Sequence, residues 1–216
     1  MAARATEWPE GLRRGTPGVV SSPNDRRPSG LLEREQSVLL VIDVQERYLP
    51  HLAEGARLVE AVRRLIAGAK LVGVPILLTE QYPQGLGHTA DVVRAELGDG
   101  VTAIEKRSMS CLGEPAFRRA LDASGRRQVV VAGIEAHACV NQTVHELLAH
   151  GALVHVAVDA IDARFARDRE VALARVERAG AIATTVESVL LEWVRTADSP
   201  EFQSIRGLIR DPLPEG

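Results

Sequence analysis

Six short apolar runs, separated by stretches with helical periodicity, recur along the chain between residue 38 and residue 184. The runs are continuous rather than alternating, which is typical of strands that helices cover on both faces of a parallel sheet. They span residues 38–42, 74–78, 101–104, 129–131, 153–158 and 181–184. This order predicts an α/β fold, namely a doubly wound, Rossmann-like parallel sheet of about six strands with helices on both faces.

The segments between the runs carry apolar residues at spacings of three and four, as on one face of a helix. They predict helices over about residues 58–72, 140–148 and 168–179, each followed by a glycine that can end a helix. Near the C-terminus, Ser199 and Pro200 have the residue types of an N-cap and a first helical position. The short helix predicted there has an apolar stripe, which we expect to dock on another surface.

Composition divides the 216 residues into three parts. Residues 1–36 are rich in proline, glycine and charge without apolar periodicity, so we expect an extended or disordered arm, or one that lies over a neighbouring subunit. Residues 37–196 should form the α/β domain, and residues 197–216 a docking helix and tail.

Charge and cysteine content narrow the class of protein. The net charge is −3 and basic residues form no block, which disfavours a nucleic-acid partner. The two cysteines, Cys111 and Cys139, have neither metal-ligand nor disulfide spacing, which fits the reducing cytoplasm. No apolar stretch reaches the roughly 18 residues of a membrane span, and no G-x-G-x-x-G follows a strand, so we expect no membrane or dinucleotide site.

Polar side chains stand where the predicted strands end. In open α/β sheets, ligands bind beyond the carboxyl ends of the strands, near the point where strand order reverses. The residues there are Asp43; Glu80, Gln81 and Tyr82; Glu105 and Lys106; Cys139, after a short turn; and Asp159. The sequence therefore directs a carboxylate, an amine and a thiol to one edge of the sheet.

Cys139 lies between an apolar run and a helical stretch. Unpaired N–H groups and the helix dipole favour thiolate at such a turn, so we expect its pKa to fall below the usual value of about 8.5. A carboxylate such as Asp43 could take the thiol proton, and an ammonium such as Lys106 could stabilise the charge. The alternative is a passive, buried thiol, with each charged residue serving as a cap or a solvated surface group.

Several of these segments together resemble the isochorismatase-like cysteine hydrolases, a family that includes nicotinamidases and carbamoylsarcosine amidases. The resemblance runs from about Ser37 to Trp193. Its motifs are residues 40–45 with Tyr48, Glu105–Lys106 with Ser108, residues 133–140 ending in Cys139-Val140, and residues 184–188. In addition, residues 79–87 look like the matching segment of a poorly characterised subgroup of isochorismatase-domain proteins. The stretch from Gly133 to Cys139 is the most specific.

The resemblance implies a catalytic triad of Asp43, Lys106 and Cys139. It also implies a cis peptide bond between Ile134 and Glu135, with the backbone N–H groups of Glu135 and Cys139 forming an oxyanion hole. The implied reaction is acyl transfer through a thioester on Cys139. Relatives commonly form dimers, tetramers or larger homo-oligomers, so we expect self-association.

Two departures from the family's sequence pattern narrow the range of possible substrates. Metal-dependent nicotinamidases carry an Asp-x-His where this chain has Glu80-Gln81-Tyr82, so we predict neither a metal nor another cofactor. Relatives that cleave isochorismate lack the cysteine, so Cys139 favours a small amide, imide or similar carbonyl substrate. Gln45, Tyr48 and Tyr82 are predicted to contact that substrate. A non-catalytic binding or scaffold protein of the same fold is the alternative.

Overall fold

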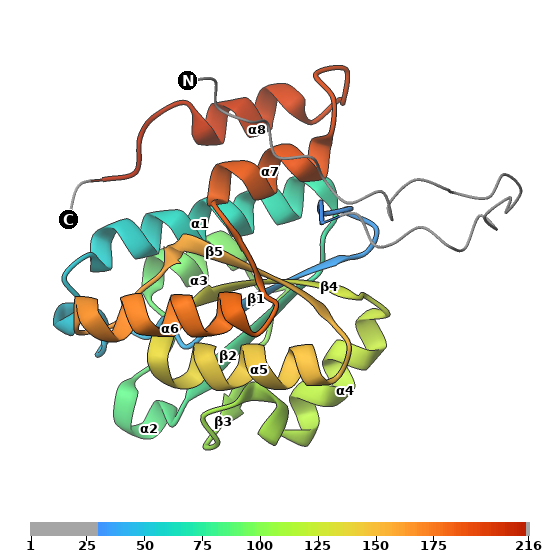
Figure 1. Ribbon diagram of the computed structural model, residues 1–216. Coiled ribbons are helices and arrows are strands. Elements are labelled where there is room, and N and C mark those ends of the chain that lie inside the picture. Colours follow the sequence, from blue (N-terminus) through green and yellow to red (C-terminus); the bar gives the residue numbers. More distant parts are fainter. Residues whose placement is uncertain (1–29, 215–216) are drawn as a thin grey trace, which may run out of the picture.

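The computed structural model describes residues 30–214, and its centre is a six-stranded, all-parallel sheet (Figure 1). The strand order is β3-β2-β1-β4-β5-β6. The strands are β1 (Ser37–Ile42), β2 (Ile76–Gln81), β3 (Ile104–Lys106), β4 (Gln128–Gly133), β5 (Leu153–Ile161) and β6 (Ile182–Thr184). The predicted α/β class and doubly wound topology are thereby confirmed.

The order of the strands reverses between β1 and β4, which are direct neighbours. Ile42 at the end of β1 pairs with Gly133 at the end of β4. The residues that follow these two strands therefore emerge side by side, which is where an open α/β sheet forms its ligand crevice.

Helices cover both faces of the sheet (Figure 1). On one side lie α1 (Gly55–Val72), α3 (Asp91–Leu97), α7 (Val186–Val194) and α8 (Phe202–Ile209). On the other lie α4 (Pro115–Ser124), α5 (Asn141–Ala149) and α6 (Ala166–Arg178). Short helical turns connect the rest: η2 (Leu49–His51), α2 (Pro83–Leu86), η3 (Cys111–Gly113) and η4 (Ala136–Val140).

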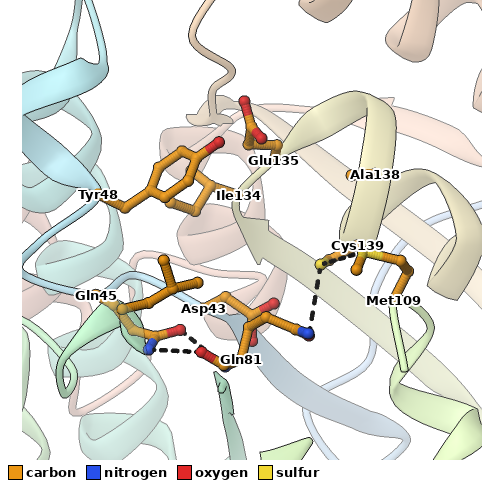
Figure 2. A pocket seen from close by; sticks show the side chains of 10 residues that line it. Asp43, Gln45, Tyr48, Gln81, Met109, Ile134, Glu135, Ala138 and Cys139 are labelled. Atoms are coloured by element: carbon orange, nitrogen blue, oxygen red, sulfur yellow. Dashed lines mark hydrogen bonds between the residues drawn. The ribbon is translucent and has the colours of Figure 1, made fainter. Parts of the chain in front are cut away.

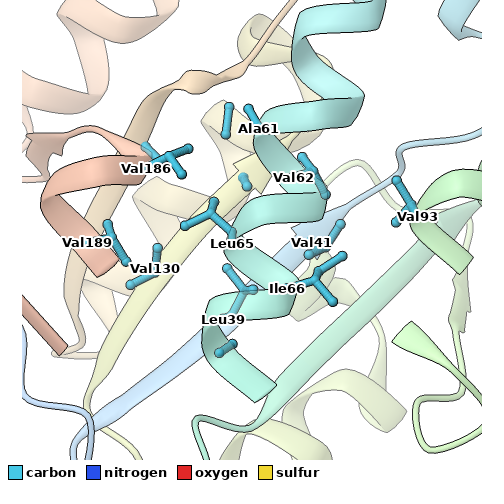
Figure 3. Close-up of a cluster of buried hydrophobic side chains, with 14 of the residues drawn as sticks. Leu39, Val41, Ala61, Val62, Leu65, Ile66, Val93, Val130, Val186 and Val189 are labelled. Atoms are coloured by element: carbon cyan, nitrogen blue, oxygen red, sulfur yellow. The ribbon is translucent and has the colours of Figure 1, made fainter. Parts of the chain in front are cut away.

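Strand β1 explains why the apolar runs are continuous. Leu39 and Val41 pack under α1 in one hydrophobic cluster, part of which Figure 3 shows. Leu40 and Ile42 point to the opposite cluster, beneath α5. Each such side chain contributes about 1.5–3 kcal/mol when it is fully removed from water, so both faces of the central strand stabilise the fold.

The structure corrects several sequence-based boundaries and adds three helices. Strand β3 begins at Ile104 rather than at residue 101. Strand β5 continues to Ile161, so Asp159 lies inside the strand, where its carboxylate accepts a hydrogen bond from the N–H of Val186. Helices α3, α4 and α7 were not predicted. Few apolar side chains of α3 and α4 are buried, whereas the buried residues of α7 do follow helical spacing, so its signal was present in the sequence and was missed.

The predicted arm is only partly within the described residues. Residues 1–29 lie outside them, but residues 30–36 are packed against the domain. Leu32 is fully buried, its N–H donates to the Glu192 carboxylate at 2.7 Å, and its carbonyl accepts from Arg195. The α/β domain therefore includes residues 30–36, which the sequence had assigned to the arm.

The C-terminal helix docks as expected, but it begins later. Helix α8 starts at Phe202 rather than Pro200, and the Ser199 hydroxyl donates to the Glu201 carboxylate just before it. Ile205 is completely buried against α1 and α7. The helix thus completes the core of its own domain. None of the helices between residues 30 and 214 is both long and apolar enough to cross a membrane.

Candidate active site

A buried ion pair occupies the carboxyl edge of the sheet. Asp43 follows β1 with a left-handed backbone (φ 53°), a conformation that aspartate tolerates better than most residues. Its Oδ2 lies 2.7 Å from Lys106 Nζ at the end of β3, and its Oδ1 accepts a 2.8 Å hydrogen bond from the Thr79 hydroxyl. Burial raises the pKa of Asp43, although Lys106 and Thr79 oppose that change.

Lys106 is held by several acceptors at once. Besides Asp43, its ammonium donates to Gln81 Oε1 at 2.6 Å and to the backbone carbonyls of Met109 (3.1 Å) and Ser108 (3.3 Å). Its side chain has no exposed surface. Burial lowers the pKa of Lys106, but the Asp43 carboxylate more than compensates, so the pKa is raised and the amine stays charged.

The turn that carries Cys139 starts from a glycine that no other residue could replace without distortion. Gly133 ends β4 with φ +122°, and a Cβ at this position would clash with the carbonyl oxygen of Ile42 in β1. The peptide bond between Ile134 and Glu135 is cis. The chain then forms the π-helical turn η4, in which Cys139 is the fourth residue.

The Cys139 thiol faces the ion pair. Its Sγ lies 4.0 Å from Gln81 Oε1, which also accepts from Lys106, and 3.9 Å from Met109 Sδ. Figure 2 shows Asp43, Gln81 and Cys139 around a common space, with Tyr48 and Glu135 across from them. The structure therefore brings the three predicted residues together.

The predicted fall in the thiol pKa is wrong. Burial raises the pKa of Cys139 to about 12, and the negative charge of Asp43 acts in the same direction, while Lys106 opposes both. The prediction rested on the N–H groups and dipole of the following helix, whereas Cys139 is 6% exposed and lies beside the Asp43 carboxylate. At neutral pH the resting cysteine is therefore a thiol.

A cavity of about 160 Å³ opens beside Cys139. Its lining residues come from the end of β2 and from the segments that follow β1, β2, β3 and β4. They are Asp43, Gln45, Tyr48, Gln81, Leu86, Met109, Ile134, Glu135, Ala138 and Cys139. The carboxylate and the thiol thus share a space that a small molecule could enter, and most of the remaining wall is apolar.

The three residues predicted to contact substrate differ in position. Tyr48 lines the cavity, and burial together with the Glu135 carboxylate raises its pKa, so its hydroxyl stays protonated. Gln45 also lines it, but its amide is engaged with backbone groups: Nε2 donates to the carbonyls of Gln81 and Gly87, and Oε1 accepts from Gln81 N–H. Gln45 therefore fixes the loop geometry.

Tyr82 is not among the cavity's lining residues, so its predicted role is corrected. Its backbone is left-handed (φ 39°), which turns the ring outward. The ring is 43% exposed and packs under the Arg107 guanidinium, 4.5 Å from the ring centroid.

Two side chains at the site had no obvious sequence signal. Thr79 orients Asp43 from the interior of β2, and in the sequence it is simply the polar residue that follows the apolar run 74–78. Arg164, in the loop after β5, contacts Glu135 Oε1 through its Nε at 3.1 Å and its backbone N–H at 3.2 Å.

The remaining candidates do not line the cavity. Cys111 is completely buried, with Sγ 3.8 Å from the Thr79 hydroxyl, and burial raises its pKa to about 11. Within residues 30–214, no cluster of three potential metal ligands occurs. Glu80 instead accepts from the N–H and hydroxyl of Thr89 and contacts His88 Nδ1 at 3.0 Å.

Comparison with known proteins agrees with this geometry. The sequence model described as the Isochorismatase domain matches residues 37–188. The chain belongs to the isochorismatase family. Isochorismatase domain-containing protein 2A of Mus musculus is 40% identical over 191 residues, covering 88% of this chain and 90% of the relative. Isochorismatase domain-containing protein 2 of Homo sapiens is 41% identical, covering 88% and 91%.

Solved structures share this fold. A structure described as the MAR1 ribonuclease from Caenorhabditis elegans superposes with a TM-score of 0.81 at 36% identity, covering 86% of this chain and 95% of that one. The YcaC gene product of Escherichia coli, described as an octameric hydrolase of unknown specificity, gives a TM-score of 0.78 at 23% identity, covering 85% and 92%. At 23% identity, the likeness to YcaC shows a shared fold alone.

Proposed function

We propose that this isochorismatase-family protein is a metal-independent cysteine hydrolase that acts on a small amide, imide or similar carbonyl compound. The observation that carries the proposal is the joint position of Cys139 and Asp43 in one cavity wall, with Lys106 2.7 Å behind the carboxylate. Family membership supports hydrolysis as the reaction class.

The first half-reaction forms a thioester. Asp43 takes the proton of the Cys139 thiol as Sγ attacks the carbonyl carbon, and the backbone N–H groups of Glu135 and Cys139 stabilise the oxyanion. The tetrahedral intermediate then collapses and expels the amine, which receives the proton from Asp43. A thiol with a pKa of about 12 needs such a base at the moment of attack, and the raised pKa of Asp43 improves its basicity.

The second half-reaction releases the acyl group. A water molecule gives a proton to Asp43 and attacks the thioester carbon. The carbon–sulfur bond then breaks, the sulfur recovers the proton, and a carboxylic acid leaves. Lys106 keeps the site electrically balanced in each step, because its ammonium remains paired with Asp43 or with the neighbouring acceptors.

The cavity limits the size of the substrate. A dry protein cavity of roughly 150 Å³ accommodates benzene, so the 160 Å³ beside Cys139 suits a molecule of about that size. The chemistry uses the side chains named here and calls for no cofactor. The proposal extends to a cytoplasmic homo-oligomer, and light scattering of the purified chain tests the association.

The test is turnover by the wild type and by Cys139→Ala across a panel of small amides, imides and esters. RNA joins the panel because a related structure is described as a ribonuclease. We expect Cys139→Ala to remain folded by circular dichroism and to lose turnover, whereas the matched variant Cys111→Ala keeps it. Activity that survives in Cys139→Ala contradicts the mechanism.

The rival function is binding or scaffolding without catalysis. It predicts no turnover and no acylation of Cys139 by any compound on the panel. The apolar cavity alone is equally consistent with that function, so the result for Cys139 separates the two.

A further inference from the structure

The mouth of the cavity carries a second ion pair that the proposed mechanism does not use. Glu135 lines the cavity with its side chain 11% exposed, and Arg164 binds its Oε1 from outside while remaining 45% exposed. The Arg164 guanidinium lies 5.7 Å from the ring centroids of both Tyr48 and Phe165. The Glu135 carboxylate lies at the rim of the cavity, near the Tyr48 hydroxyl (Figure 2), and the guanidinium is the more exposed member of the pair.

The charged groups at the cavity are unevenly distributed. Among its lining residues, all within the described part of the chain, the charged side chains are the carboxylates of Asp43 and Glu135. Lys106 lies behind Asp43 and is fully buried, so it neutralises that carboxylate without reaching the cavity. Burial opposes ionisation of Glu135, but the Tyr48 hydroxyl and Arg164 hold the pKa of Glu135 below its ordinary value, so it stays charged.

We infer that Glu135 is a specificity-determining residue that admits uncharged substrates with N–H donors, such as primary amides, and rejects carboxylates. An N–H group at the mouth could donate to the Glu135 carboxylate, whereas an anion of the same size would meet a like charge in a partly desolvated space. Arg164 moderates that charge from outside. The inference rests on the proposed function, since it names the substrate class that reaches Cys139.

Two alkylating reagents of nearly equal size test the inference without requiring turnover. Iodoacetamide is neutral and carries an NH₂ group, and iodoacetate is its carboxylate counterpart. With either one, the Cys139 sulfur forms a bond to the methylene carbon as iodide leaves, and the thiol proton passes to solvent. The second-order rate at the Cys139 peptide is measured by mass spectrometry, and the amide-to-acetate ratio is divided by the same ratio for glutathione.

In the wild type, the amide-to-acetate rate ratio at Cys139 should be at least about tenfold larger than the ratio for glutathione, which is the scale of a partly screened like-charge contact. Glu135→Gln should lower that preference by about tenfold, because it removes the carboxylate and leaves Arg164 unpaired. Arg164→Gln should raise it by about threefold, the smaller effect of a more exposed charge. Glu135→Asp should retain most of the preference.

The inference predicts that substitutions of Glu135 and Arg164 shift the normalised amide-to-acetate ratio in opposite directions. Structural damage would instead change the rates of both reagents alike and leave the ratio unchanged. The matched controls are Glu170→Gln and Arg167→Gln, which alter the exposed pair joined at 2.9 Å on α6 and should leave the ratio unchanged. The inference is overturned if the ratios of Glu135→Gln and Arg164→Gln shift in the same direction, or if they shift no further than those of the controls. It is also overturned if iodoacetamide does not label Cys139. Selectivity without turnover would refute only the hydrolase proposal, and turnover without selectivity only this inference.

Discussion

Replacing Lys106 with methionine should destabilise the protein more than replacing its partner Asp43 with asparagine. Methionine keeps most of the side-chain volume but leaves Asp43 Oδ2 without its counter-charge, while Thr79 still donates to Oδ1. Breaking a buried ion pair from one side costs about 3–5 kcal/mol. That is a large fraction of the roughly 5–15 kcal/mol by which a domain is stable.

The partner variant Asp43→Asn should cost less, about 1–3 kcal/mol. Lys106 would still donate to Gln81 Oε1 and to the carbonyls of Ser108 and Met109, and asparagine can still accept from Thr79. The double variant should cost less than the sum of the two single changes, because it removes both charges together.

The cost of Lys106→Met should also depend on pH. Without the ammonium, the folded-state pKa of Asp43 rises further above the unfolded value, so the folded protein holds this proton to higher pH than the unfolded chain. A raised folded pKa stabilises at low pH and loses that contribution as pH rises through it. The deficit should therefore be smaller at pH 5 than at pH 8.

Urea denaturation of wild type, the two single variants and the double variant at both pH values measures these differences. A Lys106→Met cost at or below that of Asp43→Asn, or a deficit that does not change with pH, would refute the assignment of a buried, mutually dependent pair.

Three further outcomes are expected. Gly133→Ala should cost at least about 3 kcal/mol or prevent folding, because its Cβ meets the Ile42 carbonyl. The control is Gly151→Ala, at φ +82° in open space, which should cost about 1–2 kcal/mol in the same urea assay. The kcat/KM profile should fall on its acid side above the ordinary carboxyl range, since burial raises the pKa of Asp43 and the base must be ionised; a limb at an ordinary aspartate pKa would contradict this. Ile205→Ala should cost about 2–4 kcal/mol by urea denaturation if α8 completes the core, and a cost near zero would show that it does not.

The sheet could be predicted from sequence because its signal is local. Each face of β1 is buried, so Leu39 and Leu40 are both apolar, and continuous runs identify central strands without knowledge of their neighbours. The strand-end positions of Asp43 and Lys106 follow from the same runs, since the ends of parallel strands meet at one edge.

The electrostatics could not be predicted, because they depend on contacts between distant segments. The raised pKa of Cys139 comes from burial and from Asp43, 96 positions earlier in the chain. The outward turn of Tyr82 depends on its own left-handed backbone and on Arg107 from the next strand's end. Arg164 belongs to a loop whose sequence shows no periodicity, so its contact with Glu135 becomes visible only once β4 and β5 are paired.

The central claim is that Cys139 carries the acyl group. The most direct measurement is acid-quenched mass spectrometry of the enzyme during turnover of an amide or ester from the panel, followed by peptide mapping. We predict a mass increase equal to the acyl group, located on the Cys139 peptide, absent from Cys139→Ala and lost on treatment with hydroxylamine. Turnover that proceeds with Cys139 unmodified, or an adduct on another residue, would contradict the mechanism.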